Sequence, residues 1–76
     1  KIIHVELNNH NITTDFRKYL LSILVNKNKI TVNNLIYFLN NNIYDNKYNN
    51  NLCITFSNLT KKQFKNNDII NINKIN

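Results

Sequence analysis

The chain contains no glycine and no proline, so every tight turn has to be built from other residues. Many turns need a backbone conformation with positive φ, which glycine adopts freely and most other residues adopt only at a cost. Asparagine is the best remaining residue for such positions, and it makes up 20 of the 76 residues. We therefore expect Asn to form the turns, beginning with the polar run at residues 8–11. The lack of glycine also excludes any phosphate-binding loop built on glycines.

Length and charge narrow the range of function classes. Residues 1–76 are enough for one small domain and too few for a Rossmann unit or a barrel enzyme. Ten basic residues against four acidic residues give a net charge of +6, which favours nucleic acid or an anionic surface as the partner. The single Cys53 excludes an internal disulfide and a multi-cysteine zinc site. No apolar run reaches the ~18 residues that a membrane span needs, so we expect no membrane partner.

Hydrophobic periodicity predicts a strand followed by a helix near the start of the chain. Residues 1–7 alternate between apolar and polar side chains, which predicts a strand. Thr13 or Thr14 is expected to cap an amphipathic helix over residues 15–24. The side chains expected to face the core are Ile3, Val5 and Leu7 of the strand and Phe16, Tyr19, Leu20, Ile23 and Leu24 of the helix.

The segment 29–39 fits two structures. Its β-branched and aromatic residues favour a strand, and Asn33 and Asn34 weaken a helix. Thr31 could instead cap a helix, with one apolar face formed by Val32, Leu35, Ile36 and Leu39. We prefer the strand, and we expect Tyr37 to lie in the core rather than on the surface.

The rest of the chain predicts a loop, a strand, a helical turn and a final short strand. Residues 40–51 are rich in Asn and poor in apolar residues, which predicts a low-complexity loop. Leu52–Phe56 alternates as a strand does, residues 60–64 are expected to form one helical turn, and Ile70 and Ile72 mark the last strand. This order predicts an α+β domain, a small antiparallel-rich sheet of three to four strands with one main helix on one face.

Three segments agree in order and spacing with one known family. Residues 3–7, a turn and residues 13–18 match its first strand and the start of its helix. Residues 32–35 match a Val-Asn-Thr-Leu strand, and Tyr48 followed by Leu52–Phe56 matches an aromatic residue and the third strand. On these segments the chain resembles the ribosomal large-subunit protein L twenty-three family.

The resemblance implies a structural constituent of the large ribosomal subunit, which binds ribosomal RNA near the polypeptide exit tunnel beside neighbouring ribosomal proteins. Carried over by position, it points to Thr13, Arg17, Lys18, Val32, Asn33, Asn34, Tyr48 and Thr55. RNA binding needs cations for phosphates and polar or aromatic groups for sugars and bases. The candidate RNA-binding residues are Arg17, Lys18, Lys27, Lys29, Asn33, Asn34, Lys47, Tyr48, Lys61, Lys62 and Lys65.

The composition also indicates a source. Gly, Pro and Ala are absent and use GC-rich codons, whereas Asn, Ile and Lys can be written with A and T alone. Such an AT-rich gene is typical of a reduced organelle. We therefore expect an organelle ribosome in a plastid of the apicoplast type, with the mitochondrion as the alternative.

Two other domain types fit part of the pattern. Residues 64–72 resemble the closing segment of ubiquitin-like β-grasp domains, with a helix starting at Thr31; lacking Gly-Gly, this would be an interaction domain without a conjugating C-terminus. A winged-helix DNA-binding domain would use helices over 16–24 and 31–39 and a recognition helix over 52–64. An extended segment 29–39 favours the ribosomal assignment, and a helix there favours either alternative.

The sequence shows no arrangement of residues that is typical of a catalytic site. Cys53 has no positioned base nearby in the sequence, and His4 and Glu6 share a strand face without a third metal ligand. The four carboxylates form no acid–base pair and lie scattered at Glu6, Asp15, Asp45 and Asp68. We expect a protein that is not an enzyme and that uses no cofactor, metal or small-molecule substrate.

Overall fold

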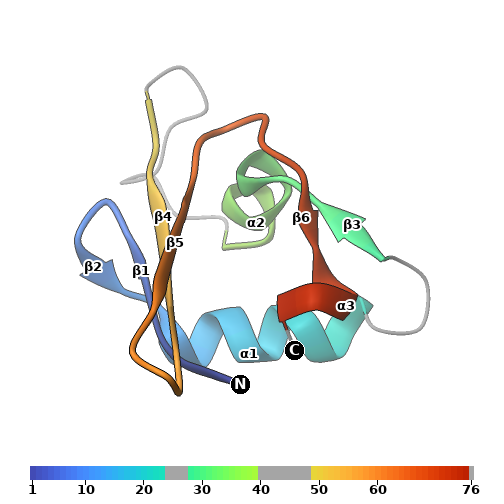
Figure 1. The fold of residues 1–76 in the computed structure, drawn as a ribbon. Helices are drawn as coiled ribbons and strands as arrows, with labels where there is room; N and C mark the ends of the chain where they lie inside the picture. Colours follow the sequence, from blue (N-terminus) through green and yellow to red (C-terminus); the bar gives the residue numbers. More distant parts are fainter. Residues whose placement is uncertain (24–27, 40–48, 76) are drawn as a thin grey trace.

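The computed structural model describes residues 1–23, 28–39 and 49–75, which form an α+β domain, as the sequence predicts (Figure 1). The main sheet is antiparallel, with the strand order β2 (His10–Asn11), β1 (Ile2–Leu7), β4 (Leu52–Phe56) and β5 (Lys61–Phe64). A second sheet pairs β3 (Lys29–Ile30) with β6 (Ile70–Asn71). The helices are α1 (Thr13–Ile23), α2 (Val32–Leu39) and the short α3 (Ile72–Ile75).

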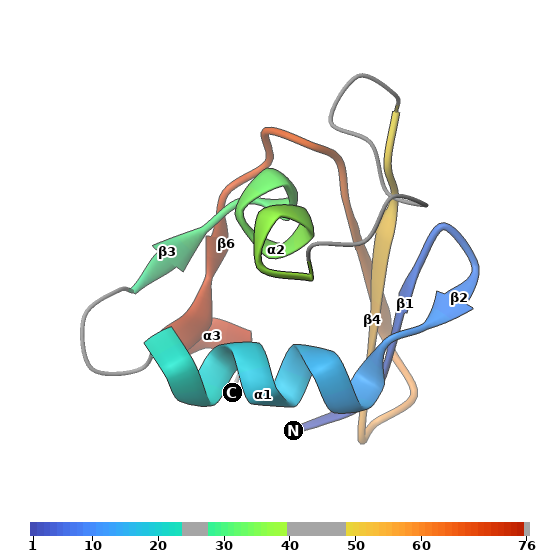
Figure 2. The same ribbon diagram turned by 180° about the vertical axis from the view of Figure 1, so that it is seen from behind.

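All helices pack on one side of the main sheet. Figures 1 and 2 show this sheet nearly edge-on, with α1, α2 and the smaller sheet on the same side of it. The core between them contains Val5 and Leu7 from β1, Phe16 from α1 and Leu35 from α2, all with no exposed surface. The opposite face of the sheet carries polar residues such as Glu6, because side chains alternate between the faces of a strand.

The β1–β2 hairpin confirms that Asn replaces glycine in a turn, but the predicted turn at 8–11 is confined to Asn8 and Asn9 because His10–Asn11 is the strand β2. Leu7 pairs with His10, so the loop contains just two residues, Asn8 and Asn9. Both have positive φ, 51° and 68°, which is the requirement of a type I′ turn. Asparagine tolerates this conformation better than other residues with a Cβ atom, so the hairpin forms without glycine.

The first strand differs from its prediction at its start. Ile2 is 7% exposed and Ile3 is 42% exposed, so Ile2 faces the core and the assignment of Ile3 to the inner face is wrong. The register against β4 shifts between Ile2 and His4, which is the mark of a β-bulge. A bulge inserts one extra residue and reverses the alternation on one side of it. Val5 and Leu7 are buried as predicted.

Helix α1 confirms the predicted amphipathic stripe from Phe16 to Leu20, while Ile23 is partly buried and Leu24 lies outside the described residues. Phe16, Tyr19 and Leu20 are buried, and burial raises the pKa of the Tyr19 hydroxyl above its usual value. The expected threonine cap is wrong, because Asn11 Oδ1 accepts the hydrogen bond from Thr13 N–H (3.0 Å). The Thr13 hydroxyl instead accepts a hydrogen bond from Val5 N–H (3.0 Å) and so ties the helix to β1.

The preferred strand over residues 29–39 is wrong beyond Ile30, because Val32–Leu39 forms helix α2. Thr31 and Asn34 cap this helix reciprocally. Thr31 N–H donates to Asn34 Oδ1 (3.0 Å), and Asn34 N–H donates to the Thr31 hydroxyl (3.3 Å). This pairing stabilises a helix start and outweighs the β propensity of the segment. Tyr37 is 84% exposed, so its expected place in the core is also wrong.

The C-terminal third corrects two further predictions. Leu52–Phe56 is a strand as predicted, but the expected helical turn at 60–64 is the strand β5. The last strand ends at Asn71, and Ile72 begins α3 instead of continuing it. Of the predicted loop at 40–51, residues 40–48 lie outside the described residues.

Side-chain hydrogen bonds between asparagines join four separate segments. Asn8 Nδ2 donates to Asn50 Oδ1 (2.7 Å), and Asn51 N–H donates to Asn8 Oδ1 (2.9 Å). Asn50 N–H donates to Asn66 Oδ1 (3.0 Å), and Asn33 Nδ2 donates to Asn67 Oδ1 (3.1 Å). Asn50 is 2% exposed, so the bonds that it makes satisfy polar groups that water does not reach, whereas the Asn33–Asn67 bond is exposed. Several asparagines are therefore structural, whatever the codon bias that supplied them.

The β4–β5 hairpin contains a strained residue, which gives a first prediction. Leu59 has φ 68°, a backbone conformation that costs a residue with a Cβ atom about 1 kcal/mol. Its side chain is 76% exposed, so burial of the side chain offsets little of this cost. We expect Leu59→Asn to raise the free energy of unfolding by about 1 kcal/mol, measured by urea denaturation. Leu59→Ala is the control, because it removes the apolar side chain and keeps the Cβ atom. An equal gain in Leu59→Ala would contradict backbone strain as the cause.

Candidate nucleic-acid interface

The charged side chains are distributed unevenly. Among the described residues, the carboxylates are Glu6, Asp15 and Asp68, against eight Lys and Arg side chains. Glu6 Oε1 lies 3.6 Å from His4 Nε2, a contact that is an ion pair only when the imidazole is protonated. Asp68 accepts a hydrogen bond from Lys65 N–H (2.7 Å), which closes the loop after β5. The cations are therefore largely uncompensated by neighbouring carboxylates.

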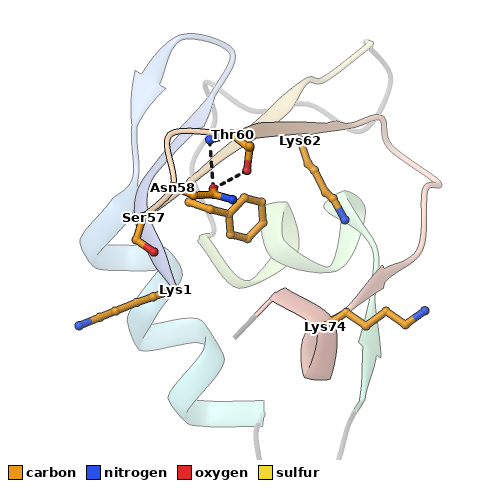
Figure 3. A pocket seen from close by; sticks show the side chains of 7 residues that line it. Lys1, Ser57, Asn58, Thr60, Lys62 and Lys74 are labelled. Carbon is orange, nitrogen blue, oxygen red and sulfur yellow. Dashed lines mark hydrogen bonds between the residues drawn. The ribbon is translucent and has the colours of Figure 1, made fainter.

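Three lysines from separate parts of the chain border one hollow of about 310 Å³. Lys1 precedes β1, Lys62 belongs to the edge strand β5, and Lys74 belongs to α3. Figure 3 shows Lys1 on one side of the hollow and Lys62 and Lys74 on the other. The remaining lining residues carry no charge and are Phe56, Ser57, Asn58 and Thr60. We call these seven residues the lysine hollow.

The polar groups of the lysine hollow are arranged to donate hydrogen bonds. Thr60 donates twice to Asn58 Oδ1, from its N–H (3.2 Å) and from its hydroxyl (2.6 Å), as the dashed lines in Figure 3 show. These bonds occupy the acceptor of the Asn58 amide. Asn58 Nδ2 and the Ser57 hydroxyl donate no hydrogen bond within the part of the chain that the structure describes. Figure 3 shows the side chains of Lys1 and Lys74 extending outward on opposite sides of the hollow, so the lysines border these donors rather than contact them. Free donors in a hollow bordered by cations suit an anion.

A second hollow of about 260 Å³ continues the basic surface from Lys1 to α1. Arg17 lines it, and Arg17 Nη2 donates to the carbonyl oxygen of Ile2 (3.4 Å). This contact holds the guanidinium against the start of β1. Lys1 lines both hollows and so connects Arg17 in one hollow with Lys62 and Lys74 in the other. We call these four residues the basic strip.

The structure brings together some of the candidate residues and separates others. Arg17 and Lys62 belong to the basic strip, whereas Lys18, Lys29, Lys61 and Lys65 are exposed but line neither hollow. The side chains of Asn33 and Asn34 are engaged in the hydrogen bonds with Asn67 and Thr31 described above. Three further candidates lie outside the described residues: Lys27, Lys47 and Tyr48.

The sequence missed Lys1, Lys74 and Phe56 as site residues. Lys1 and Lys74 stand near opposite ends of the sequence, so no local pattern could connect them. They border the same hollow because β1 pairs with β4, with Ile2 opposite Phe56, and because β6 leads directly into α3. The hydrogen bond from Ser57 N–H to the Lys1 carbonyl oxygen (2.8 Å) anchors this end of the hairpin.

The exposed face of the main sheet offers no comparable arrangement. Cys53 is half-buried there and lies opposite Glu6 and Gln63 in the register. Within the described residues, no three His, Cys, Asp or Glu side chains are grouped to hold a metal ion. None of the helices in the described part is long and apolar enough to cross a membrane.

No protein-family model, no curated protein and no solved structure matches the chain. Its function therefore has to be argued from its own residues and their arrangement.

Proposed function

We propose that the chain is an RNA-binding domain of a ribonucleoprotein, which contacts the RNA backbone through the basic strip. One observation carries the proposal, namely that three lysines from separate segments border the lysine hollow and no carboxylate lines it. Like charges placed together repel one another in the free protein, and a phosphate removes this repulsion. Neutralising phosphates also releases the counterions of the nucleic acid, which favours binding.

The narrower assignment to a large ribosomal subunit in an organelle is part of this proposal. Three elements follow the order that the resemblance implies: the strand Ile2–Leu7, the helix Thr13–Ile23 and the strand Leu52–Phe56. Helix α2 stands where the resemblance implies a strand, and a helix in this segment favours the two alternative domain types over the ribosomal assignment. Co-sedimentation with large ribosomal subunits tests the assignment directly. Release of the chain at low salt would argue against it.

A second candidate is a protein-interaction domain of the ubiquitin-like type. The observation that favours it is the start of α2 directly after Thr31, where that alternative places its helix. The winged-helix alternative gains the same helix but loses its recognition helix, because residues 52–56 and 61–64 are strands. Absence of RNA binding by a folded domain would favour the protein-interaction candidate.

The test of RNA binding uses two matched double variants. We expect Lys62→Gln/Lys74→Gln to weaken binding on the order of tenfold at 0.1 M salt and to reduce the salt slope by about 1.4, at 0.7 per phosphate contact. The control is Lys18→Gln/Lys29→Gln, which removes the same charge from exposed positions outside both hollows. Fluorescence anisotropy of a labelled RNA across a salt series measures both quantities. Equal losses in the two double variants would mean that net charge, rather than the basic strip, determines binding.

A further inference from the structure

The lysine hollow contains an aromatic ring as well as cations. Phe56 is half-buried and lines the hollow together with Lys1, Lys62 and Lys74. Its partner in the sheet register is Ile2, whose buried side chain supports this end of β4 from the neighbouring strand. Phe56 packs against the hydrophobic core and also lines the hollow, so the hollow combines the uncovered part of an aromatic ring with a border of cations.

A nucleotide is the ligand that combines these two requirements. A nucleobase has a flat face that stacks on aromatic side chains, and its phosphate needs cations and hydrogen-bond donors. The hollow supplies the donors through Asn58 Nδ2 and the Ser57 hydroxyl, because the Asn58 acceptor is already occupied by Thr60. Its volume of about 310 Å³ lies at the lower end of the range for small-ligand sites, which suits a single unit rather than a longer segment.

We infer that the lysine hollow receives one unpaired nucleotide of the RNA, with the base against Phe56 and the phosphate among the lysines. The inference rests on the proposed RNA-binding function and names the form of RNA that the site selects. A base inside a duplex is stacked and paired, so its face is not available to a side chain in a hollow. The domain should therefore prefer single-stranded RNA, loops or ends to a continuous duplex.

The test compares two RNAs and three variants by fluorescence anisotropy. The RNAs are a single-stranded oligouridine and a blunt duplex with the same number of phosphates. We expect the wild-type domain to bind the single strand about tenfold more tightly. Phe56→Leu should remove most of this preference by weakening single-strand binding more than duplex binding, whereas Phe56→Tyr, which keeps a ring, should retain it. Tyr37→Leu is the matched control, since Tyr37 is 84% exposed on α2 and outside the hollow.

The outcomes separate failure of this inference from failure of the proposed function. Equal binding of both RNAs, with no effect of Phe56→Leu, would overturn the inference and leave RNA binding intact. A loss in Tyr37→Leu without a loss in Phe56→Leu would overturn it by moving the stacking site to α2. Absence of binding to either RNA, with a folded circular dichroism spectrum, would overturn the proposed function itself.

Discussion

Replacement of Asn8 by alanine is expected to lower the free energy of unfolding by about 3 kcal/mol. Asn8 has φ 51°, a conformation that costs alanine about 1 kcal/mol more than asparagine. Its side-chain amide also donates to Asn50 Oδ1 (2.7 Å) and accepts from Asn51 N–H (2.9 Å), and the loss of each of these part-buried hydrogen bonds costs about 1 kcal/mol. The free energy of unfolding of a small domain is roughly 5–10 kcal/mol, so this change removes a large fraction of the stability.

Three companion variants separate the backbone effect from the hydrogen bonds. Asn8→Gly keeps the positive φ and loses the amide, so we expect a loss of about 2 kcal/mol. The neighbouring Asn9 has φ 68° and is exposed, and no side-chain hydrogen bond joins it to the described residues. Asn9→Ala should therefore lower the free energy of unfolding by about 1 kcal/mol, and Asn9→Gly should leave it nearly unchanged. Urea denaturation midpoints measure all four. Wild-type stability in Asn8→Gly would show that the asparagine bonds contribute nothing.

Local patterns in the sequence predicted the elements whose determinants lie close together. The positive φ of Asn8 and Asn9 follows from the absence of glycine between two apolar segments. The buried stripe of α1 follows from the spacing of Phe16, Tyr19 and Leu20. In both cases the residues that decide the structure are within one turn or hairpin, so tertiary contacts reinforce the local preference.

One error arose where a distant part of the chain decides the structure, and another arose where a local cap outweighs the strand propensity of a segment. Residues 61–64 are mostly polar, but they form β5 because they pair with the edge of β4. Phe64 lies opposite Leu52 in this pairing. Residues 32–39 have strand propensity, but the Thr31–Asn34 caps and the burial of Leu35 against the core make them helical.

The basic character of the candidate site could be predicted from the sequence, but the residues that come together in it could not. The excess of basic residues indicated a polyanionic partner, and Arg17 and Lys62 were named from the sequence. The grouping of Lys1, Lys62 and Lys74 depends on strand register and on the position of α3, which no spacing along the chain records.

Addition of RNA is expected to raise the free energy of unfolding by about 2.7 kcal/mol at a concentration 100 times the Kd. For a domain of this size, the melting temperature should rise by about 10–20 °C. The reason is mass action, because a ligand that binds only the folded state draws molecules out of the unfolded state. Differential scanning fluorimetry with and without the single-stranded oligouridine measures the shift.

The unfolded chain provides the critical comparison for this shift. It carries the same net charge of +6, so diffuse attraction to RNA acts on both states and largely cancels. A shift therefore reports the folded arrangement of the basic strip. Lys62→Gln/Lys74→Gln, with tenfold weaker binding, should show about half the stabilisation at the same RNA concentration, near 1.4 kcal/mol. A wild-type domain that binds RNA but shows no shift would mean that the unfolded chain binds equally well, and that the folded hollow has no special role.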